Sequence, residues 1–290
     1  MAFPLTHLLV AKKIIDKLQD NIVSKELFVL GSIAPDAVHY RKEFVGAAMS
    51  GIGAAKKITH LCPVSDEKWG QVTDNDGWVE CIKTFLASVS GHAASLRFSM
   101  HAPSSSVHLL RKRRLRRPAF LPVRTGSAEN HCANALRGLS NRSLLTTQHG
   151  HSPLETMSFA LGYAVHALTD IANNQSLWRT FITNHPEEAA KGYTSDYYKD
   201  LRSIDTRLYN EFFRDGEIFK LLRDATPQSI PDLVDASELL AIQDNLLNVA
   251  YFNVSADSDT SGCVYVTYQQ VLDFIDYAAE FCIRHISEFI

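Results

Sequence analysis

The sequence lacks several features that mark secreted, membrane-spanning and β-sheet proteins. Its five cysteines are odd in number, widely scattered and never spaced as C-x-x-C, which favours reduced thiols over a disulfide framework or a thiolate zinc site. No apolar run is long enough to span a bilayer. No alternating strand pattern recurs often enough to build a sheet, so the sequence predicts an all-α fold without a transmembrane segment.

The N-terminal segment also lacks the charge order of a signal peptide. Its apolar residues precede its first positive charges, Lys12 and Lys13, and no cleavage-like site follows them. Together with the pattern of reduced thiols, this order predicts a cytoplasmic protein.

Apolar residues, by contrast, are plentiful. They make up 46% of the 290 positions, which is enough for a sizeable core in one large domain or two ordinary ones. The formal net charge of −3 argues against a general nucleic-acid binder.

Outside the middle of the chain, apolar residues recur with helical spacing. The pattern predicts helices at 5–18, 26–31, 69–86, 153–178, 205–222, 237–249 and 265–290. Pro4 suits the first turn of the first helix, Gly216 follows Asp215 at an expected break in the fifth, and Ser237 is expected to cap the sixth.

The middle of the chain has a different composition. Positions 90–151 carry ten lysine and arginine residues against one acid, Glu129, and their helical periodicity is poor. We therefore expect N-terminal helices at 1–87, a basic Ser/Arg-rich segment at 88–152, and the remaining helices of the same domain at 153–290.

Three interpretations of this basic segment are open. The favoured one is a disordered or loosely attached loop. The second is an electrostatic patch from Arg111 to Arg117 that contacts acidic membranes or nucleic acid. The third is a piece foreign to the fold, for instance from a shifted reading frame.

The predicted helix at 153–178 carries two polar side chains that suit a metal ion. His166 and Asp170 are four residues apart, so they share one face of a helix that is otherwise apolar. A bound cation would offset the cost of burying the carboxylate and keep the imidazole neutral. A plain hydrogen bond between the two side chains explains the same spacing.

Two earlier segments carry further candidate ligands. His7 lies on the apolar face of the first predicted helix, where a histidine is more often a hydrogen-bonded core residue than a ligand unless other ligands converge on it. Asp36 follows Pro35 and precedes His39 by one helical turn. An Asp in this place either caps a helix or reaches across to a metal held elsewhere.

Four short motifs contain these residues in order along the chain. They are Phe-Pro-Leu-Thr-His7, Leu-Gly-Ser-Ile-Ala-Pro-Asp36, Lys-Lys-Ile-Thr-His60 and Gly-Tyr-Ala-Val-His166-Ala-Leu-Thr-Asp170. Taken together, the motifs resemble those of the bacterial zinc-dependent phospholipase C family. That family belongs to a helical superfamily that includes P1-type nucleases.

The resemblance covers roughly residues 1–86 and 153–290. It implies a multi-helix bundle of the phospholipase C/P1 nuclease type, interrupted here by a basic irregular insert. It also implies a zinc site, with the number of ions open, that hydrolyses phospholipids or other phosphodiesters. Zinc lowers the pKa of a bound water to about 7, which supplies the nucleophile.

Carried over position by position, the resemblance implies five zinc ligands: His7, Asp36, His60, His166 and Asp170. Asp36 is also the expected catalytic residue, because an acid at the family's metal site accepts the proton of the attacking water. His39 and Asn174 are expected to orient the ligands from behind.

Two other functions are compatible with the same residues. One is a P1-like nuclease, helped by the basic segment. The other is a non-catalytic helical protein whose histidine and aspartate cluster binds a structural metal or none. A structural zinc site is closed by four protein ligands, whereas a catalytic site keeps a position open for water.

Overall fold

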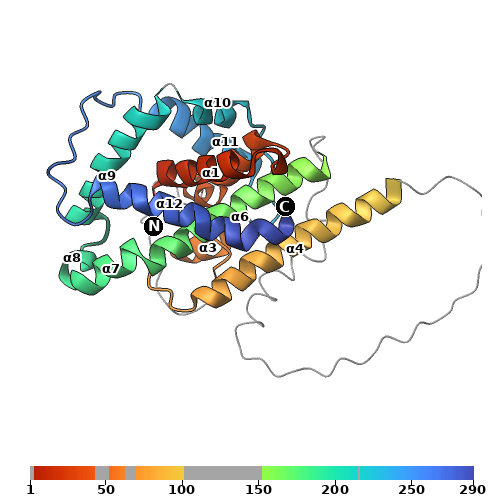
Figure 1. Ribbon diagram of the computed structural model, residues 1–290, viewed down its shortest axis with the longest axis horizontal. Coiled ribbons are helices and arrows are strands. Elements are labelled where there is room, and N and C mark those ends of the chain that lie inside the picture. Colours follow the sequence, from red (N-terminus) through yellow and green to blue (C-terminus); the bar gives the residue numbers. More distant parts are fainter. Residues whose placement is uncertain (1–2, 43–51, 63–69, 101–151, 215) are drawn as a thin grey trace, which may run out of the picture.

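The computed structural model describes residues 3–42, 52–62, 70–100, 152–214 and 216–290 (Figure 1). Within these ranges, extended structure is limited to one isolated bridge between Ile230 and Val234, and the regular elements are helices. The predicted all-α class is therefore confirmed.

Most of the described chain lies in α-helices joined by short connections. The helices are α1 (Pro4–Leu18), α2 (Lys25–Gly31), α3 (Ile52–Thr59), α4 (Asn75–Met100), α6 (Pro153–Gln175), α7 (Leu177–Asn184), α8 (Pro186–Ala190), α9 (Asp196–Leu208), α10 (Glu217–Asp224), α11 (Ala236–Asp244) and α12 (Tyr268–Ile286). A 3₁₀ segment, η2, covers Ala34–Tyr40, and two short π-helical segments, η4 and η5, follow α9 and α11 at Tyr209–Phe213 and Asn245–Val249.

Helix α6 is the central element of the fold. It starts at a capping box formed by Ser152 and Glu155, and every residue from Thr156 to Asn174 is buried. Helices α1, α2, α4 and α12 pack around it (Figure 1), and their apolar side chains form one continuous core. A helix that is surrounded on all sides needs small or apolar residues all round, which explains the high apolar content of this stretch.

Helices α2 and α6 approach each other most closely at two glycines. A Cβ atom on Gly162 would lie 2.0 Å from the carbonyl oxygen of Phe28, and one on Gly31 would lie 2.3 Å from the carbonyl oxygen of Phe159. Neither position can carry a side chain without moving backbone. The close approach brings the end of α2, including Ser32, next to the middle of α6.

Some helix ends differ from the sequence-based expectation. Helix α4 does not stop near Leu86 but continues to Met100, because the following residues are compatible with a helix and the next proline is Pro103. Helix α11 is capped by Asp235 with Glu238, not by Ser237. The run predicted at 153–178 is interrupted at Ser176, whose backbone is not helical.

The predicted basic segment at 88–152 is tested only at its ends. Residues 88–100 belong to α4 and Ser152 caps α6, so these parts are not irregular. Positions 101–151, with Arg111 to Arg117, lie outside the described residues. No helix in the described part of the chain is long and apolar enough to cross a membrane.

The cysteines follow the sequence-based expectation only in part. Cys62, Cys263 and Cys282 are reduced thiols. Cys81 is disulfide-bonded, so the expectation of reduced thiols is wrong at this position. Sequence spacing does not tell which thiols meet in space, which is why the pattern missed it.

Candidate metal centre

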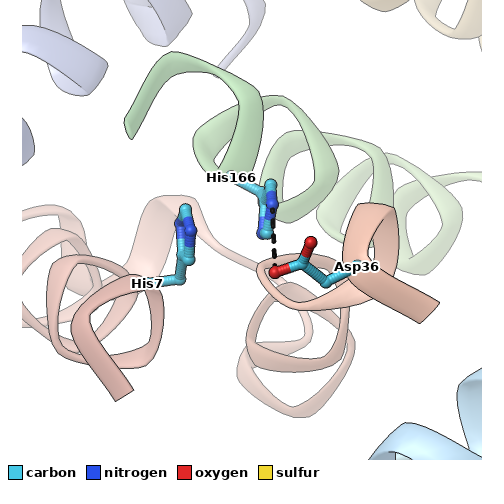
Figure 2. Close-up of side chains that lie close together, drawn as sticks. All are labelled: His7, Asp36 and His166. Atoms are coloured by element: carbon cyan, nitrogen blue, oxygen red, sulfur yellow. Dashed lines mark ion pairs between the residues drawn. The ribbon is translucent and has the colours of Figure 1, made fainter. Parts of the chain in front are cut away.

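The five residues that the resemblance implies as ligands come together inside the fold. They arrive from four places: His7 from α1, Asp36 from η2, His60 from the turn after α3, and His166 with Asp170 from α6. Figure 2 shows His7, Asp36 and His166 directed toward one another from their separate elements. We call this group of five the metal centre; their role as ligands stays a prediction.

The polar atoms of the metal centre are packed closely. His166 Nε2 lies 3.1 Å from His60 Nε2 and 3.9 Å from Asp36 Oδ2. His60 Nε2 also lies 3.4 Å from Asp36 Oδ1 and 3.6 Å from Asp170 Oδ2. His7 Nε2 is 3.7 Å from Asp170 Oδ1. All of these atoms can therefore reach one small volume.

Local structure explains why each side chain points inward. His166 and Asp170 are one turn apart on the buried face of α6, as the four-residue spacing predicts. His7 is on the buried side of α1. The cap interpretation of Asp36 is wrong, because Ile33 is the N-cap of η2 and Asp36 lies within its first turn.

Two backbone carbonyls set the protonation of the central imidazoles. His166 Nδ1 lies 2.8 Å from the carbonyl oxygen of Ser32, and His60 Nδ1 lies 2.8 Å from that of Lys56. A carbonyl oxygen only accepts hydrogen bonds, so both Nδ1 atoms carry the proton. In the neutral rings both Nε2 atoms are then acceptors, and their lone pairs face each other across 3.1 Å. A cation resolves this arrangement, and a hydrogen bond between the two rings does not.

His7 supports the same interpretation. It is only 1% exposed, and neither of its ring nitrogens makes a hydrogen bond within the described residues. Its ring stacks on His166 with centroids 3.7 Å apart and planes 9° from parallel. A buried polar group without a hydrogen bond is costly, so His7 is not the satisfied core histidine that was the commoner expectation.

Burial keeps the imidazoles of His7 and His60 neutral. It lowers the pKa of His7 to about 3, with His166 acting in the same direction, and it lowers the pKa of His60 to about 4. Neutral imidazole is the form that binds a metal ion. At neutral pH these two rings are therefore ready to act as ligands without first losing a proton.

Lys56 is a charged neighbour that the sequence analysis missed. Its Nζ lies 2.9 Å from Asp36 Oδ1, and its side chain is only 4% exposed. Burial acts to raise the pKa of the Asp36 carboxyl, but the Lys56 ammonium, His60 and His166 together outweigh this and hold that pKa well below its ordinary value. The available signal was its position four residues before His60, which places both on one face of a helix.

An open cavity of about 310 Å³ reaches the metal centre on the side of Asp36. Asp36, His39, Lys56 and Asn245 form its polar part. The rest of its wall is mostly aromatic and aliphatic, including Phe3, Tyr40, Tyr193, Tyr198, Ile242 and Leu246. An organic group can therefore lie against the wall while a charged group meets Asp36 and Lys56.

The two residues expected to orient ligands behave differently. His39 Nε2 lies 3.7 Å from Asp36 Oδ1, so the structure does bring His39 to a predicted ligand. The Asn174 amide nitrogen donates to the Val72 carbonyl and to Asn75 Oδ1. Asn174 thus joins α6 to the start of α4 and makes no hydrogen bond to the five residues of the metal centre among those that the structure describes.

The donor set fits a divalent metal ion such as zinc. Two groups of donor atoms each lie within 4.8 Å of one another: His7, Asp36 and His166 form the first, and His60, His166 and Asp170 the second. Imidazole nitrogens and carboxylate oxygens are common zinc ligands. Such an ion would bind the His7 ring, which makes no hydrogen bond within the described residues, and the facing lone pairs of His60 and His166.

Neither a family model, nor a curated protein, nor a solved structure matches the chain.

Proposed function

We propose that this protein is a zinc-dependent phosphoric diester hydrolase of the phospholipase C type. The observation that carries the proposal is the pair of carbonyl-locked imidazoles, His60 and His166, whose Nε2 lone pairs face each other 3.1 Å apart between two carboxylates. This arrangement supports a cation at the centre. The reaction class comes from the resemblance of the four sequence motifs to the zinc-dependent phospholipase C family.

In this proposal the residues of the chain have distinct tasks. His7, Asp36, His60, His166 and Asp170 hold the ion. When bound, zinc supplies a water with a pKa of about 7. Asp36 is the ligand that lines the cavity of about 310 Å³, so its carboxylate is placed to accept a proton from a molecule that enters there.

The cavity supports a catalytic site over a purely structural one. A structural zinc site is closed, whereas here a cavity of about 310 Å³ extends to Asp36. Its apolar wall suits the organic part of a phosphodiester, and we propose a phospholipid or a similar molecule as the substrate. We also propose that the protein works in the cytoplasm, a proposal that the reduced thiols at Cys62, Cys263 and Cys282 support and the disulfide-bonded Cys81 does not.

The decisive experiment measures zinc and hydrolysis together. Purified wild-type protein is expected to contain zinc and to hydrolyse bis(p-nitrophenyl) phosphate in a reaction that a chelator stops and added zinc restores. His166→Ala is expected to lose both zinc and about 1,000-fold of turnover. His185→Ala is the matched control, because His185 is exposed and outside the metal centre.

The possible results separate the competing functions. Wild-type protein without zinc would rule out both enzyme hypotheses. Zinc without chelator-sensitive hydrolysis of this compound or of phospholipid vesicles would favour the structural role. Hydrolysis of single-stranded nucleic acid in preference to phospholipid would favour the P1-like nuclease.

A further inference from the structure

The opening of the cavity that reaches Asp36 carries exposed apolar side chains. Tyr193 lines the cavity and is 50% exposed, so its ring forms part of the opening. On another wall, Asn245 and Leu246 of η5 line the same cavity. Val249 follows Asn245 by about one helical turn, which places it on the same side of the segment, and it is 58% exposed. The helical surface that lines the cavity therefore continues into solvent as apolar surface.

The chain that continues from this wall is uncharged and largely exposed. Residues 245–256, which we call the rim segment, read Asn-Leu-Leu-Asn-Val-Ala-Tyr-Phe-Asn-Val-Ser-Ala and contain no acidic, basic or histidine residue. Phe252 is 79% exposed, the highest value among the large apolar side chains that the structure describes as exposed. A phenylalanine this exposed, close to the opening of a cavity, is a candidate for contact with another apolar surface.

The neighbours of Phe252 hold the rim segment against the protein. The Tyr251 hydroxyl donates a hydrogen bond to Asp205 Oδ2 in α9. After Phe252, the carbonyl oxygen of Ser255 accepts a hydrogen bond from the Asn210 amide nitrogen in η4 at 2.9 Å. The backbone is therefore attached to the fold on both sides of the exposed ring.

The composition of the rim segment indicates which partner it suits. Nucleic acids and acidic peptides are bound by basic side chains, and the rim segment has none. Aromatic and aliphatic side chains mixed with uncharged polar ones suit the boundary between lipid headgroups and acyl chains, where aromatic rings are enriched. The surface of a zwitterionic phospholipid bilayer offers this boundary and carries no net charge, so it matches the rim segment in both respects.

We propose that the rim segment, together with Tyr193, docks the protein on the surface of a zwitterionic phospholipid bilayer and turns the opening of the cavity toward it. The inference rests on the proposed function, which makes a phospholipid the substrate, and goes beyond it in naming the surface that contacts the membrane. Docking through Val249 and Phe252 requires neither zinc nor hydrolysis. Binding to the bilayer is therefore measured separately from catalysis.

The experiment compares vesicle binding with hydrolysis, using the full chain. Flotation with phosphatidylcholine vesicles measures binding, with zinc and with a chelator. Phe252→Ser and the double variant Val249→Asp/Phe252→Ser remove the apolar contact at residues that do not line the cavity. Val264→Ser is the matched control, because Val264 is 76% exposed but lies outside the rim segment. Hydrolysis is measured on the vesicles and on bis(p-nitrophenyl) phosphate in solution.

Wild-type protein is expected to float with the vesicles whether or not zinc is present. Phe252→Ser should bind them about tenfold more weakly, because one phenyl group no longer leaves water, and the double variant at least about 50-fold more weakly. Hydrolysis of vesicle lipid should fall in parallel, while hydrolysis of the soluble compound stays at the wild-type rate. Phe252→Trp should bind at least as tightly as wild type, and Val264→Ser should match it.

Several results would overturn the inference. They are wild-type protein that stays unbound, equal losses in Phe252→Ser and Val264→Ser, and binding only to vesicles that contain phosphatidylserine. A dimer that dissociates in Phe252→Ser, without vesicle binding by wild type, would assign the surface to a second copy of the chain instead. Vesicle binding by a protein that holds no zinc and hydrolyses nothing would overturn the proposed function and leave the docking surface supported.

Discussion

The metal centre and helix α9 each place two acids in largely buried positions, but they surround those acids with different partners. Asp36 and Asp170 meet imidazole nitrogens in the metal centre. In α9, Asp200 Oδ2 accepts hydrogen bonds from the backbone N–H groups of Val264, Tyr265 and Val266 at 2.9, 2.7 and 3.3 Å. Asp205 Oδ2 accepts one from the hydroxyl of Tyr251.

The difference separates a structural carboxylate from one in a candidate binding site. Three backbone N–H donors surround the Asp200 carboxylate, so the protein itself compensates its charge. The same hydrogen bonds connect the loop before α12 to α9. In the metal centre the Nε2 atoms of neutral His60 and His166 are acceptors that lie beside carboxylates, an arrangement that a bound cation would compensate. Burial alone therefore does not distinguish the two kinds of carboxylate, whereas the chemistry of their partners does.

The largest effect is expected from a substitution that forces apart α2 and α6, because their contact places Ser32 beside His166. Gly162→Ala places a methyl group 2.0 Å from the Phe28 carbonyl oxygen, so α2 must move away from α6 and Ser32 from His166. We expect a loss of about 3 kcal/mol or more in the free energy of unfolding, together with loss of zinc binding.

The measurement is urea denaturation followed by circular dichroism, with zinc content measured on the folded fraction. Gly262→Ala is the control, because no atom lies within 4 Å of a Cβ there. Its effect should stay within about 0.5 kcal/mol. An equally stable Gly162→Ala protein with normal zinc content would show that the close helix contact does not set the geometry of the centre.

An intermediate effect is expected from pH, through Asp205. Burial raises the pKa of Asp205 to about 7, against an ordinary value of 3.8. Between these values the folded protein holds a proton that the unfolded chain has released. The free energy of unfolding therefore falls as pH rises through this window, and the contribution of Asp205 is fully present only below pH 3.8.

Asp205→Asn mimics the protonated form and should lack this dependence. The variant is expected to gain stability relative to wild type between pH 5 and pH 8, by at most about 3 kcal/mol. Taking the difference between the two proteins removes the contributions of all other titrating groups. Parallel pH profiles would show that Asp205 is ionised in the folded protein at neutral pH, and would weaken the contrast with the metal centre.

The smallest effect on stability is expected from replacing an aspartate by asparagine. Making this same change in each region compares the two regions directly. Asp200→Asn weakens the hydrogen bonds from three backbone donors and should cost about 1–2 kcal/mol, with zinc per folded chain unchanged. Asp170→Asn should change the stability of the zinc-free protein by less than about 1 kcal/mol but lower zinc affinity at least about tenfold. Denaturation and chelator competition measure the two quantities, and equal zinc affinity in both variants would remove the distinction.

Much of the fold was predictable because it depends on local chemistry. The periodic apolar residues of α1, α6 and α12 predicted helices whose starts the structure reproduces within a few residues. Pro4 indicated the start of α1, and the four-residue spacing of His166 and Asp170 placed both on one face of α6. Both predictions depend only on neighbouring residues in the sequence. The extension of α4 to Met100 was missed, because a change of composition at 88–152 does not by itself end a helix.

The candidate site was predictable only in part. The sequence motifs and their resemblance named the five residues that converge, yet spacing could not place His7 or Asp36 beside His166. Lys56 escaped notice because a lysine on an amphipathic helix usually faces water. Its burial depends on η2, which presents Asp36 to it across a gap in sequence of twenty residues.

The amino-acid sequence by itself determined which segments become helices and which of their faces turn inward, since both follow from residue size, hydrophobicity and spacing. Only the tertiary structure decided the chemistry of the metal centre. The carbonyls of Ser32 and Lys56 dictate which nitrogen of His166 and His60 carries the proton, and the contact of Gly31 with Gly162 brings Ser32 there. The Lys56 carbonyl meets His60 within one helical turn, but Ser32 meets His166 across the fold, and sequence spacing does not encode that distance.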